Sequence, residues 1–312
     1  MNFSSMEYFI ALAEERSFTR AAQRLMVTQQ TLSAHIAGVE RELGVRLVNR
    51  KVPLTLTYAG EVLLGYARRF ETDRRAMEQE FADISGDEQG LLAVGIASTR
   101  GRLLLPRAIA AFHELKPGVR VTIEEEENEN LVEALREGRV DMTVATIPAN
   151  VSGLEVRLLR TEQIVLVASW SLLRRLYGEN AQNVVSEVVR TGSLAGLEGC
   201  PFLLLGRHDE PGDLSRLLIE RAGLDVEPAI VSTNSETLME LALRDMGATF
   251  VPEDLAQTML GDSTSSMCVM DLGPSARIDI HVAWRSSTHV WSVIEDFADL
   301  LAEQVGAGGD EG

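Results

Sequence analysis

The chain has 312 residues, a length that corresponds to about two domains of roughly 150 residues each. Its composition, 45% hydrophobic and 24% charged, is typical of soluble globular proteins and excludes a disordered or fibrous chain. The longest mostly apolar run, residues 164–173, is about half of the roughly 20 residues that a bilayer-spanning helix needs, which excludes a membrane protein. The amino terminus lacks the basic and apolar segments of a secretory signal, so we expect a cytoplasmic protein.

The net charge of −18 is distributed unevenly along the chain. Residues 1–60 hold seven basic and five acidic side chains, a net charge of +2, so the remaining residues carry −20. DNA binding relies on Lys and Arg that neutralise phosphates. The asymmetry therefore favours a DNA-facing head on an acidic body.

Three short helices are predicted in the first 45 residues. Ser4 and Glu7 form a candidate capping box for the first, Ser17 can cap the second, and Thr28 can cap a third that ends at Gly44. The turn between the second and third helices has the length found in a helix-turn-helix. Residues 47–50 and 54–57 alternate apolar and polar side chains, which predicts a two-stranded wing with Arg50 and Lys51 at its tip.

The third helix carries an unusual outward face. At 100° per residue from Leu32, this face holds small or uncharged polar side chains rather than the Lys and Glu of a solvated helix: Gln30, Thr31, Ser33, Ala34, Ala37 and Gly38. Such a face lets a backbone approach the major groove while Gln and Ser reach base edges. The alternative for this helix is an ordinary packing face of small residues. The alternative for the predicted wing is a solvent-exposed hairpin that does not contact DNA.

The spacing of these residues resembles a known family. The runs SFTRAA at 17–22, VTQ at 27–29, LS at 32–33, VE at 39–40, LGV at 43–45, LT at 56–57 and AG at 59–60 are similar to the winged helix-turn-helix of LysR-type transcriptional regulators. Departures are Val48, where the family usually has Phe, and Ala34 and His35, where longer polar side chains are common. Together with the resemblance, the pattern predicts a set of DNA-contacting residues: Ser17, Thr28, Gln29, Gln30, Thr31, Ser33, Ala34, His35, Arg50, Lys51 and Thr55.

A long helix is expected from Thr57 to about Ile84. Apolar side chains recur along it at heptad-like spacing, and its other faces are charged, which predicts a pairing seam formed by Leu63, Phe70, Met77, Phe81 and Ile84. Packing on its own body alone is the alternative. The resemblance favours a homodimer or homotetramer, and Arg74 within the seam should weaken pairing. The polar break at 85–90 is the best candidate for a hinge.

Beyond residue 90, strand and helix patterns alternate, which predicts a two-lobed α/β domain like that of periplasmic binding proteins. We expect a winged helix-turn-helix at 1–58, a linker helix at 59–88 and an effector-binding domain at 89–305. Its first lobe would hold 89–161 and 266–305, its second lobe 162–265, with a disordered tail at 306–312. This part also resembles the LysR-type effector domain, for example in the Leu105-Pro106 pair, Gly138 with Asp141, and Gly247 followed by Val251-Pro252.

Ligands of open α/β sheets bind beyond the carboxyl ends of strands, near helix N-termini. That rule and the resemblance select Ser98, Thr99, Arg100, Thr146, Gly206, Arg207, Thr233 and Asn234 as effector-contacting residues. Their hydroxyl and guanidinium groups suit an anionic small molecule. For each residue, a capping or solvated loop role is the alternative.

The sequence therefore predicts a DNA-binding transcriptional regulator controlled by a small-molecule effector. Its expected partners are double-stranded DNA with a two-fold-related operator and RNA polymerase. The alternative is a solute-binding protein of the transport type, which leaves residues 1–85 unexplained. An enzyme is not expected, because no nucleophile elbow, P-loop or dinucleotide fingerprint is present. No cofactor or metal site is expected either, since the His residues and the two cysteines, Cys200 and Cys268, show no ligand spacing.

Overall fold

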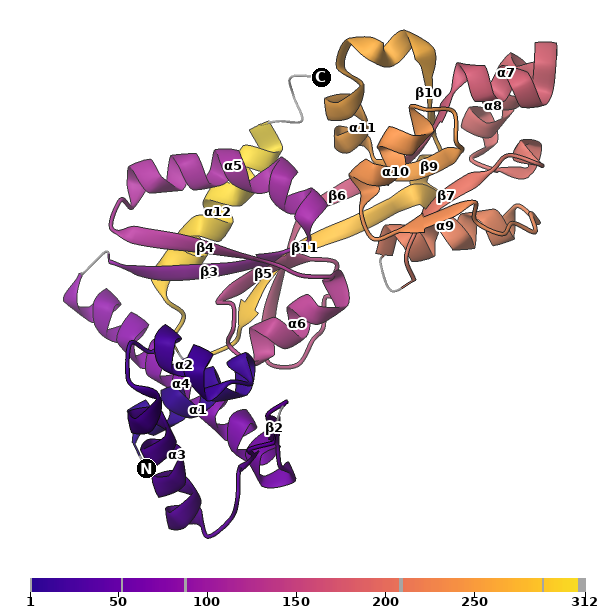
Figure 1. Cartoon of the computed structure of the whole chain (residues 1–312). Coiled ribbons are helices and arrows are strands. Elements are labelled where there is room, and N and C mark those ends of the chain that lie inside the picture. Colours follow the sequence, from indigo (N-terminus) through magenta and orange to yellow (C-terminus); the bar gives the residue numbers. More distant parts are fainter. Residues whose placement is uncertain (1, 52, 87–88, 208–209, 288, 308–312) are drawn as a thin grey trace. The chain divides into compact units, whose positions relative to one another are not determined.

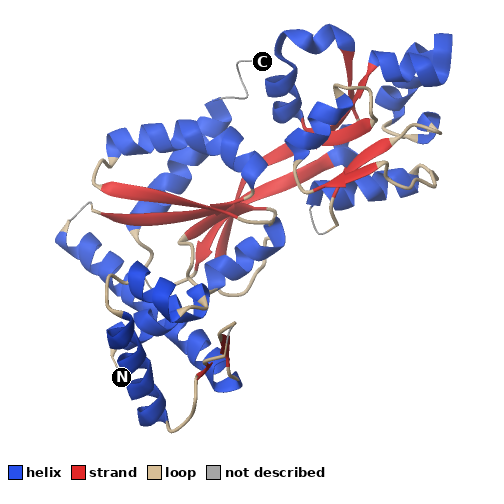
Figure 2. Cartoon of the chain, viewed as in Figure 1, coloured by secondary structure: helices blue, strands red, loops and turns tan. Residues whose placement is uncertain are grey.

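The computed structural model describes residues 2–51, 53–86, 89–207, 210–287 and 289–307. They form two compact units (Figure 1). The first unit comprises residues 1–90 together with Arg136–Arg139, and the second comprises Leu91–Leu135 and residues 140–312. Helices dominate the first unit, whereas the second combines helices with a large sheet (Figure 2). No described helix is long and apolar enough to cross a bilayer.

Three helices form the head of the first unit: α1 (Phe3–Glu15), α2 (Phe18–Arg24) and α3 (Gln29–Leu43). The predicted caps Ser17 and Thr28 are confirmed, because each side chain accepts a hydrogen bond from the backbone N–H three residues later. Gly44 ends α3 in the left-handed conformation, as predicted. The prediction for α1 was wrong in register, because its cap is Asn2, which forms the capping box with Ser5.

The wing and the linker helix complete this unit. The wing consists of β1 (Val48–Asn49) and β2 (Thr55–Leu56), paired antiparallel. Helix α4 (Tyr58–Ser85) is capped by Thr57, as the sequence predicts, and ends at Gly86. Residues 87 and 88 of the predicted hinge lie outside the described residues.

The second unit begins with strand β3 and ends with helix α12. Its helices and strands follow in this order: β3 (Gly90–Ile96), α5 (Ser98–Leu115), β4 (Val119–Glu125), α6 (Asn128–Arg136), β5 (Met142–Ala145), β6 (Leu154–Ser169), α7 (Trp170–Tyr177), α8 (Ala181–Thr191), β7 (Phe202–Leu205), α9 (Glu210–Arg221), β8 (Ile230–Ser232), α10 (Ser235–Ala242), β9 (Ala248–Pro252), α11 (Glu253–Leu260), β10 (Met267–Asp271), β11 (Arg277–Arg285) and α12 (Ser292–Ala307). Helix α12 continues past residue 306, where we had expected the tail to begin, and residues 308–312 lie outside the described part.

The strands form one continuous hydrogen-bonded order, β4-β3-β5-β11-β6-β9-β7-β8, with β10 also paired to β6. The strand β6 joins the two lobes: residues 154–163 pair with β11, and residues 164–169 pair with β9 and β10. Helices α5 and α12 lie side by side in the first lobe (Figure 1), where Phe112 and Phe297 meet edge to face. One boundary differs from the prediction, because β10 pairs with the second-lobe half of β6, whereas β11 and α12 return to the first lobe.

Candidate functional site

Helix α3 has one buried and one open face. Leu32, Ile36 and Val39 are buried in the core of the head. The opposite face exposes four of the predicted DNA-contacting residues: Gln29, Gln30, Thr31 and Ala34. Ser33, beside them, is partly exposed. The structure therefore brings these five uncharged residues together on the exposed side of α3.

Two other predicted contacts already have a structural role. The Ser17 hydroxyl lies 3.4 Å from the Arg20 backbone nitrogen, and the Thr28 hydroxyl lies 3.1 Å from that of Thr31. These hydroxyls accept hydrogen bonds that would otherwise be missing at the first turns of α2 and α3. Each residue marks the start of one helix of the helix-turn-helix, and Thr28 is exposed next to Gln29.

The structure does not place His35 with this set. Its Nε2 lies 2.9 Å from the Ser5 hydroxyl, and its ring packs on Tyr8 with centroids 4.8 Å apart. His35 therefore faces α1 rather than the open surface. The sequence contained this signal, because His35 follows Leu32 by three residues and continues the buried stripe of α3.

The wing gathers cationic side chains beside α3. Arg46, Arg50 and Lys51 line a hollow of about 710 Å³, together with Glu40. Arg50 and Lys51 are both exposed, as the sequence predicts for a DNA-contacting tip. Thr55 also lines the hollow, but its hydroxyl lies 3.2 Å from the Asn49 amide nitrogen across the wing and so joins the two strands.

An exposed apolar stripe runs along α4. Phe70, Met77, Phe81 and Ile84 keep between 46% and 72% of their surface exposed, as a pairing seam requires. The prediction for Leu63 was wrong, because this residue is buried in the core of the head. The stripe instead continues through residues that sequence analysis missed: Tyr58, Val62 and Tyr66. Their four-residue spacing carried the signal, but we had fixed the register on Leu63.

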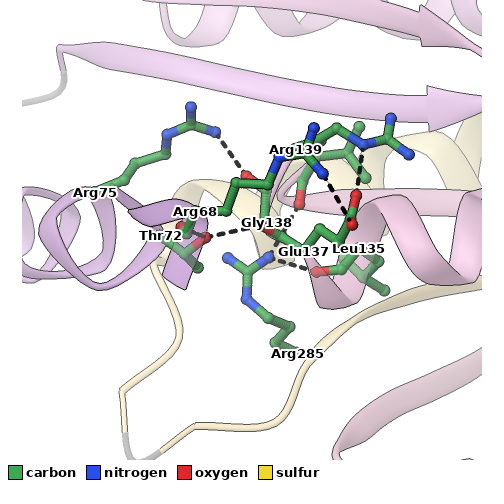
Figure 3. Close-up of polar contacts among 9 residues, drawn as sticks. Arg68, Thr72, Arg75, Leu135, Glu137, Gly138, Arg139 and Arg285 are labelled. Carbon is green, nitrogen blue, oxygen red and sulfur yellow. Dashed lines mark hydrogen bonds and ion pairs between the residues drawn. The ribbon is translucent and has the colours of Figure 1, made fainter. Parts of the chain in front are cut away.

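Helix α4 also binds the turn Arg136–Arg139 (Figure 3). The Thr72 hydroxyl lies 3.0 Å from the Glu137 carbonyl oxygen, and Arg75 donates to the Gly138 carbonyl at 3.3 Å. Arg68 forms a 3.1 Å ion pair with the Glu137 carboxylate. Gly138 has φ +72°, and a Cβ there would lie 1.9 Å from the Thr72 hydroxyl oxygen. Only glycine therefore fits the turn against this helix without rearrangement.

The residues that flank this turn are hydrogen-bonded to strand β11. Arg285, at the end of β11, donates to the carbonyl oxygens of Leu135 at 2.7 Å and Val140 at 3.1 Å (Figure 3). Within the turn, Arg139 donates to Glu137 at 3.0 Å, while burial and the charge of Arg68 lower the pKa of Arg139. The backbone entering and leaving the turn is thus fixed to the sheet of the second unit.

The predicted effector residues of the first lobe lie at the start of α5 and after β5. Ser98 is exposed and donates to Glu125 at 2.9 Å, and Thr99 follows it in the first turn of α5. Thr146 exchanges backbone hydrogen bonds with the Asn128 side chain, whereas its own buried hydroxyl oxygen has no hydrogen-bond partner in the structure. A ligand hydrogen-bonding group could satisfy this oxygen.

Arg100 differs from its prediction in environment. It is 5% exposed, and its Nε lies 3.2 Å from Oε2 of Glu162, which is 3% exposed. Oε1 of Glu162 accepts from Arg160 at 3.0 Å, and Arg160 also pairs with Asp254 at 2.6 Å. Burial by itself lowers the pKa of Arg160, but the charges and hydrogen bonds of Glu162 and Asp254 together outweigh it, so the net shift is upward. The charge of Arg100 is therefore already compensated within the protein.

The second-lobe residues follow β7 and β8. Gly206 lies beside Thr233, and the Gly206 backbone N–H donates to Ser232. Asn234 caps α10 by accepting from the Thr237 N–H at 2.8 Å. Arg207 is exposed and lines a different hollow, formed with α9. The structure thus brings Gly206, Thr233 and Asn234 together but assigns Arg207 to another surface.

An ion pair links the two lobes at these positions. Arg102, in the first turns of α5, lies 2.5 Å from Glu236 in the first turn of α10. The N-terminal turns of α5 and α10, one from each lobe, therefore lie close together. Backbone N–H groups at the start of a helix are of the kind that bind anions.

Two family models together match most of the chain. A model described as a bacterial regulatory helix-turn-helix protein of the lysR family matches residues 3–61, and a LysR substrate binding domain matches residues 85–306. The chain belongs to the LysR family. It is a transcriptional regulator with a DNA-binding head and an effector-binding domain, rather than an enzyme or a transport-type binding protein.

Individual proteins are similar over almost the whole length. The chain is 27% identical to the DNA-binding transcriptional dual regulator OxyR of Escherichia coli over 96% of this chain and 95% of that protein. It is 36% identical to a probable hydrogen peroxide-inducible genes activator of Mycobacterium xenopi, over 52% of this chain and 87% of that protein. The solved structure of full-length CbnR in complex with target DNA has the same fold, with a TM-score of 0.67, 24% identity and coverage of 97% of this chain and 100% of that one.

Proposed function

We propose that this LysR-family regulator binds a two-fold-related operator as a dimer in the cytoplasm, where bacterial DNA lies. The outer face of α3 reads the major groove, and Arg50 and Lys51 of the wing contact phosphates. The observation that supports this assignment is the charge-free, partly small-residue face of α3 beside a cationic wing. Such a face allows close approach, while the −20 charge of the remaining chain repels DNA elsewhere.

Binding to the intergenic DNA upstream of the protein's own gene tests the assignment. We expect Arg50→Ala to weaken binding to all sequences and to reduce the slope of log K against log salt by about one per lost phosphate contact. Gln30→Ala should instead change the preferred sequence. Arg190→Ala, at an exposed arginine of the second unit, is the matched control and should leave both properties unchanged. An unchanged salt slope in Arg50→Ala would remove the wing contact from the proposal.

The exposed stripe of α4 supports the dimer. Apolar side chains between 43% and 87% exposed extend from Tyr58 to Ile84, a pattern that is costly in water and typical of a paired helix. A charge within this stripe should separate the subunits, so Phe81→Glu should lower the molar mass measured by light scattering. Glu61→Lys, at an exposed acidic position on another face of the same helix, is the control. An undiminished mass in Phe81→Glu would show that other surfaces hold the subunits together.

The effector is a small anion held between the N-terminal turns of α5 and α10. The unpartnered Thr146 hydroxyl oxygen and the exposed Ser98 hydroxyl supply hydrogen-bonding groups, whereas Arg100 acts through Glu162 rather than as a free charge. A panel of small carboxylates, each with its neutral amide as the control, tests this class by the shift of the unfolding temperature. Stabilisation by the amides but not the acids would overturn it.

The contacts of the turn Arg136–Arg139 support a route by which effector binding changes the arrangement of the DNA-binding heads, and through them the action of RNA polymerase. The turn binds α4, the linker of the reading head, and is covalently continuous with α6 and β5 of the effector-binding unit. Effector binding controls DNA only if it favours one arrangement of the heads. Thr72→Val removes the hydroxyl that contacts Glu137 at nearly constant volume. We expect it to reduce the effect of effector on operator binding and to leave operator affinity without effector unchanged.

Peroxide sensing through a reactive thiol is not the function that this chain supports. Both of its cysteines are buried, and burial raises the pKa of Cys200 to about 11 and that of Cys268 to about 12. The thiolate is the reactive form, so neither side chain is activated at neutral pH. The chain thus lacks the activated thiol that a thiol-based peroxide sensor needs, although it is similar to a protein named as a probable activator of hydrogen peroxide-inducible genes. Unchanged operator binding after treatment with hydrogen peroxide is the expected result.

A further inference from the structure

Glu40 is an acidic residue beside the cationic wing. It lies near the end of α3, and its side chain is only 15% exposed. A carboxylate so close to a DNA-binding surface repels phosphate unless a nearby cation compensates it. The contacts of Glu40 therefore decide what this carboxylate does at this place.

The two carboxylate oxygens of Glu40 have different partners. Oε1 accepts the backbone N–H of Leu47 at 2.8 Å and lies 3.4 Å from the backbone nitrogen of Val48, so it fixes the first strand of the wing to α3. Oε2 lies 3.3 Å from Nη2 of Arg50, with which it forms an ion pair. One side chain of α3 thus holds both the backbone of the wing and the guanidinium at its tip.

Arg50 is held from two further sides. Its Nη1 lies 3.4 Å from the Ser33 hydroxyl oxygen on α3, and its guanidinium carbon lies 5.5 Å from the centroid of the Phe18 ring on α2. A guanidinium has five N–H donors, and the contacts with Glu40 and Ser33 use two of them. The remaining donors are available to a phosphate, because 49% of the Arg50 side chain is exposed.

From these contacts we propose that Glu40 is a positioning residue for DNA recognition. It orients Arg50 toward the phosphate backbone and, through Arg50, the hydroxyl of Ser33 on the reading face of α3. An arginine fixed before binding loses less side-chain entropy when it contacts phosphate. The role rests on the proposed DNA contacts of Arg50 and Ser33 and adds to them a residue that touches no base or phosphate.

The matched variant is Glu40→Gln, which removes the charge and keeps an oxygen that can accept the Leu47 N–H. We expect it to lower affinity for the upstream intergenic DNA about two- to fivefold, the range measured for partly exposed ion pairs. Its unfolding temperature should stay unchanged. The control Glu7→Gln makes the same charge change at an exposed position of α1 and should not lower affinity.

A double-mutant cycle separates positioning from a structural role. Glu40→Gln should have no further effect on DNA affinity when Arg50 is already alanine. An equal loss in the Arg50→Ala background would overturn the proposal, because Glu40 would then act through the wing backbone alone. A gain of affinity in Glu40→Gln would also overturn it and would show that the carboxylate only repels DNA.

The same cycle distinguishes this proposal from the function on which it rests. If Arg50→Ala leaves affinity and salt slope unchanged, the phosphate contact itself is wrong, and the role of Glu40 is overturned together with it. If Arg50→Ala lowers the slope but the two effects are additive, the DNA interface stands and only the positioning role of Glu40 is overturned.

Discussion

Replacement of Glu162 by glutamine should destabilise the effector-binding unit strongly. Glu162 is 3% exposed and lies between Arg100, which is 5% exposed, and Arg160. The amide cannot compensate either positive charge, and its NH₂ group would face a second donor. Removing one member of a buried ion pair costs about 3–5 kcal/mol, because the remaining charge stays buried without a counterion. We expect a loss of stability in this range.

The second carboxylate on Arg160 offers a built-in control. Asp254 also pairs with this arginine, but 46% of its side chain is exposed. An exposed partner contributes about 1 kcal/mol or less, so Asp254→Asn should have a small effect. The contrast between the two variants tests burial rather than charge alone.

Urea unfolding of the full chain, followed by tryptophan fluorescence, measures the loss of stability of the second structural unit in each variant. All three tryptophans, at positions 170, 284 and 291, belong to the second unit, so their fluorescence does not report unfolding of the head. A loss in Glu162→Gln no larger than that in Asp254→Asn would refute the reasoning and would mean that water compensates the two arginines.

Two further predictions concern the turn and the thiols. Gly138→Ala should destabilise the chain by at least about 2 kcal/mol in urea unfolding followed by circular dichroism, because left-handed strain adds to overlap with Thr72. Gly153 also has a positive φ, +80°, but no atom lies within 4 Å of a Cβ placed there, so Gly153→Ala should show the cost of the backbone strain alone. Equal losses of stability in the two variants would exclude a contribution from overlap with Thr72. Cys200 and Cys268 should resist thiol reagents at pH 8 until the chain unfolds. The unfolded chain ionises its thiols from about pH 8.5, whereas the folded chain keeps these protons to about pH 11, so the free energy of unfolding should fall as pH rises through this window. Rapid labelling of the folded chain, or stability that is flat above pH 8.5, would contradict this account.

Local sequence patterns determined the helices of the head and the caps of α2, α3 and α4. A cap such as Thr28 or a left-handed stop such as Gly44 depends on neighbours within a few residues, so its signal is contained in a short window. Helical spacing likewise separates the buried Leu32 stripe from the open face that carries Gln30. The charge asymmetry needed only a count of side chains along the chain.

Long-range pairing was decided only by the tertiary structure. Arg100 and Glu162 are 62 positions apart, and no periodicity reveals that they neutralise each other in the interior. Thr72 and Glu137, which fix the turn to the linker helix, are separated by 65 positions. Leu63 was misplaced for the same reason, because two apolar faces of one helix look alike until the core of the head covers one of them. Periodicity shows which side chains share a face, and only the folded path of the chain determines what that face meets.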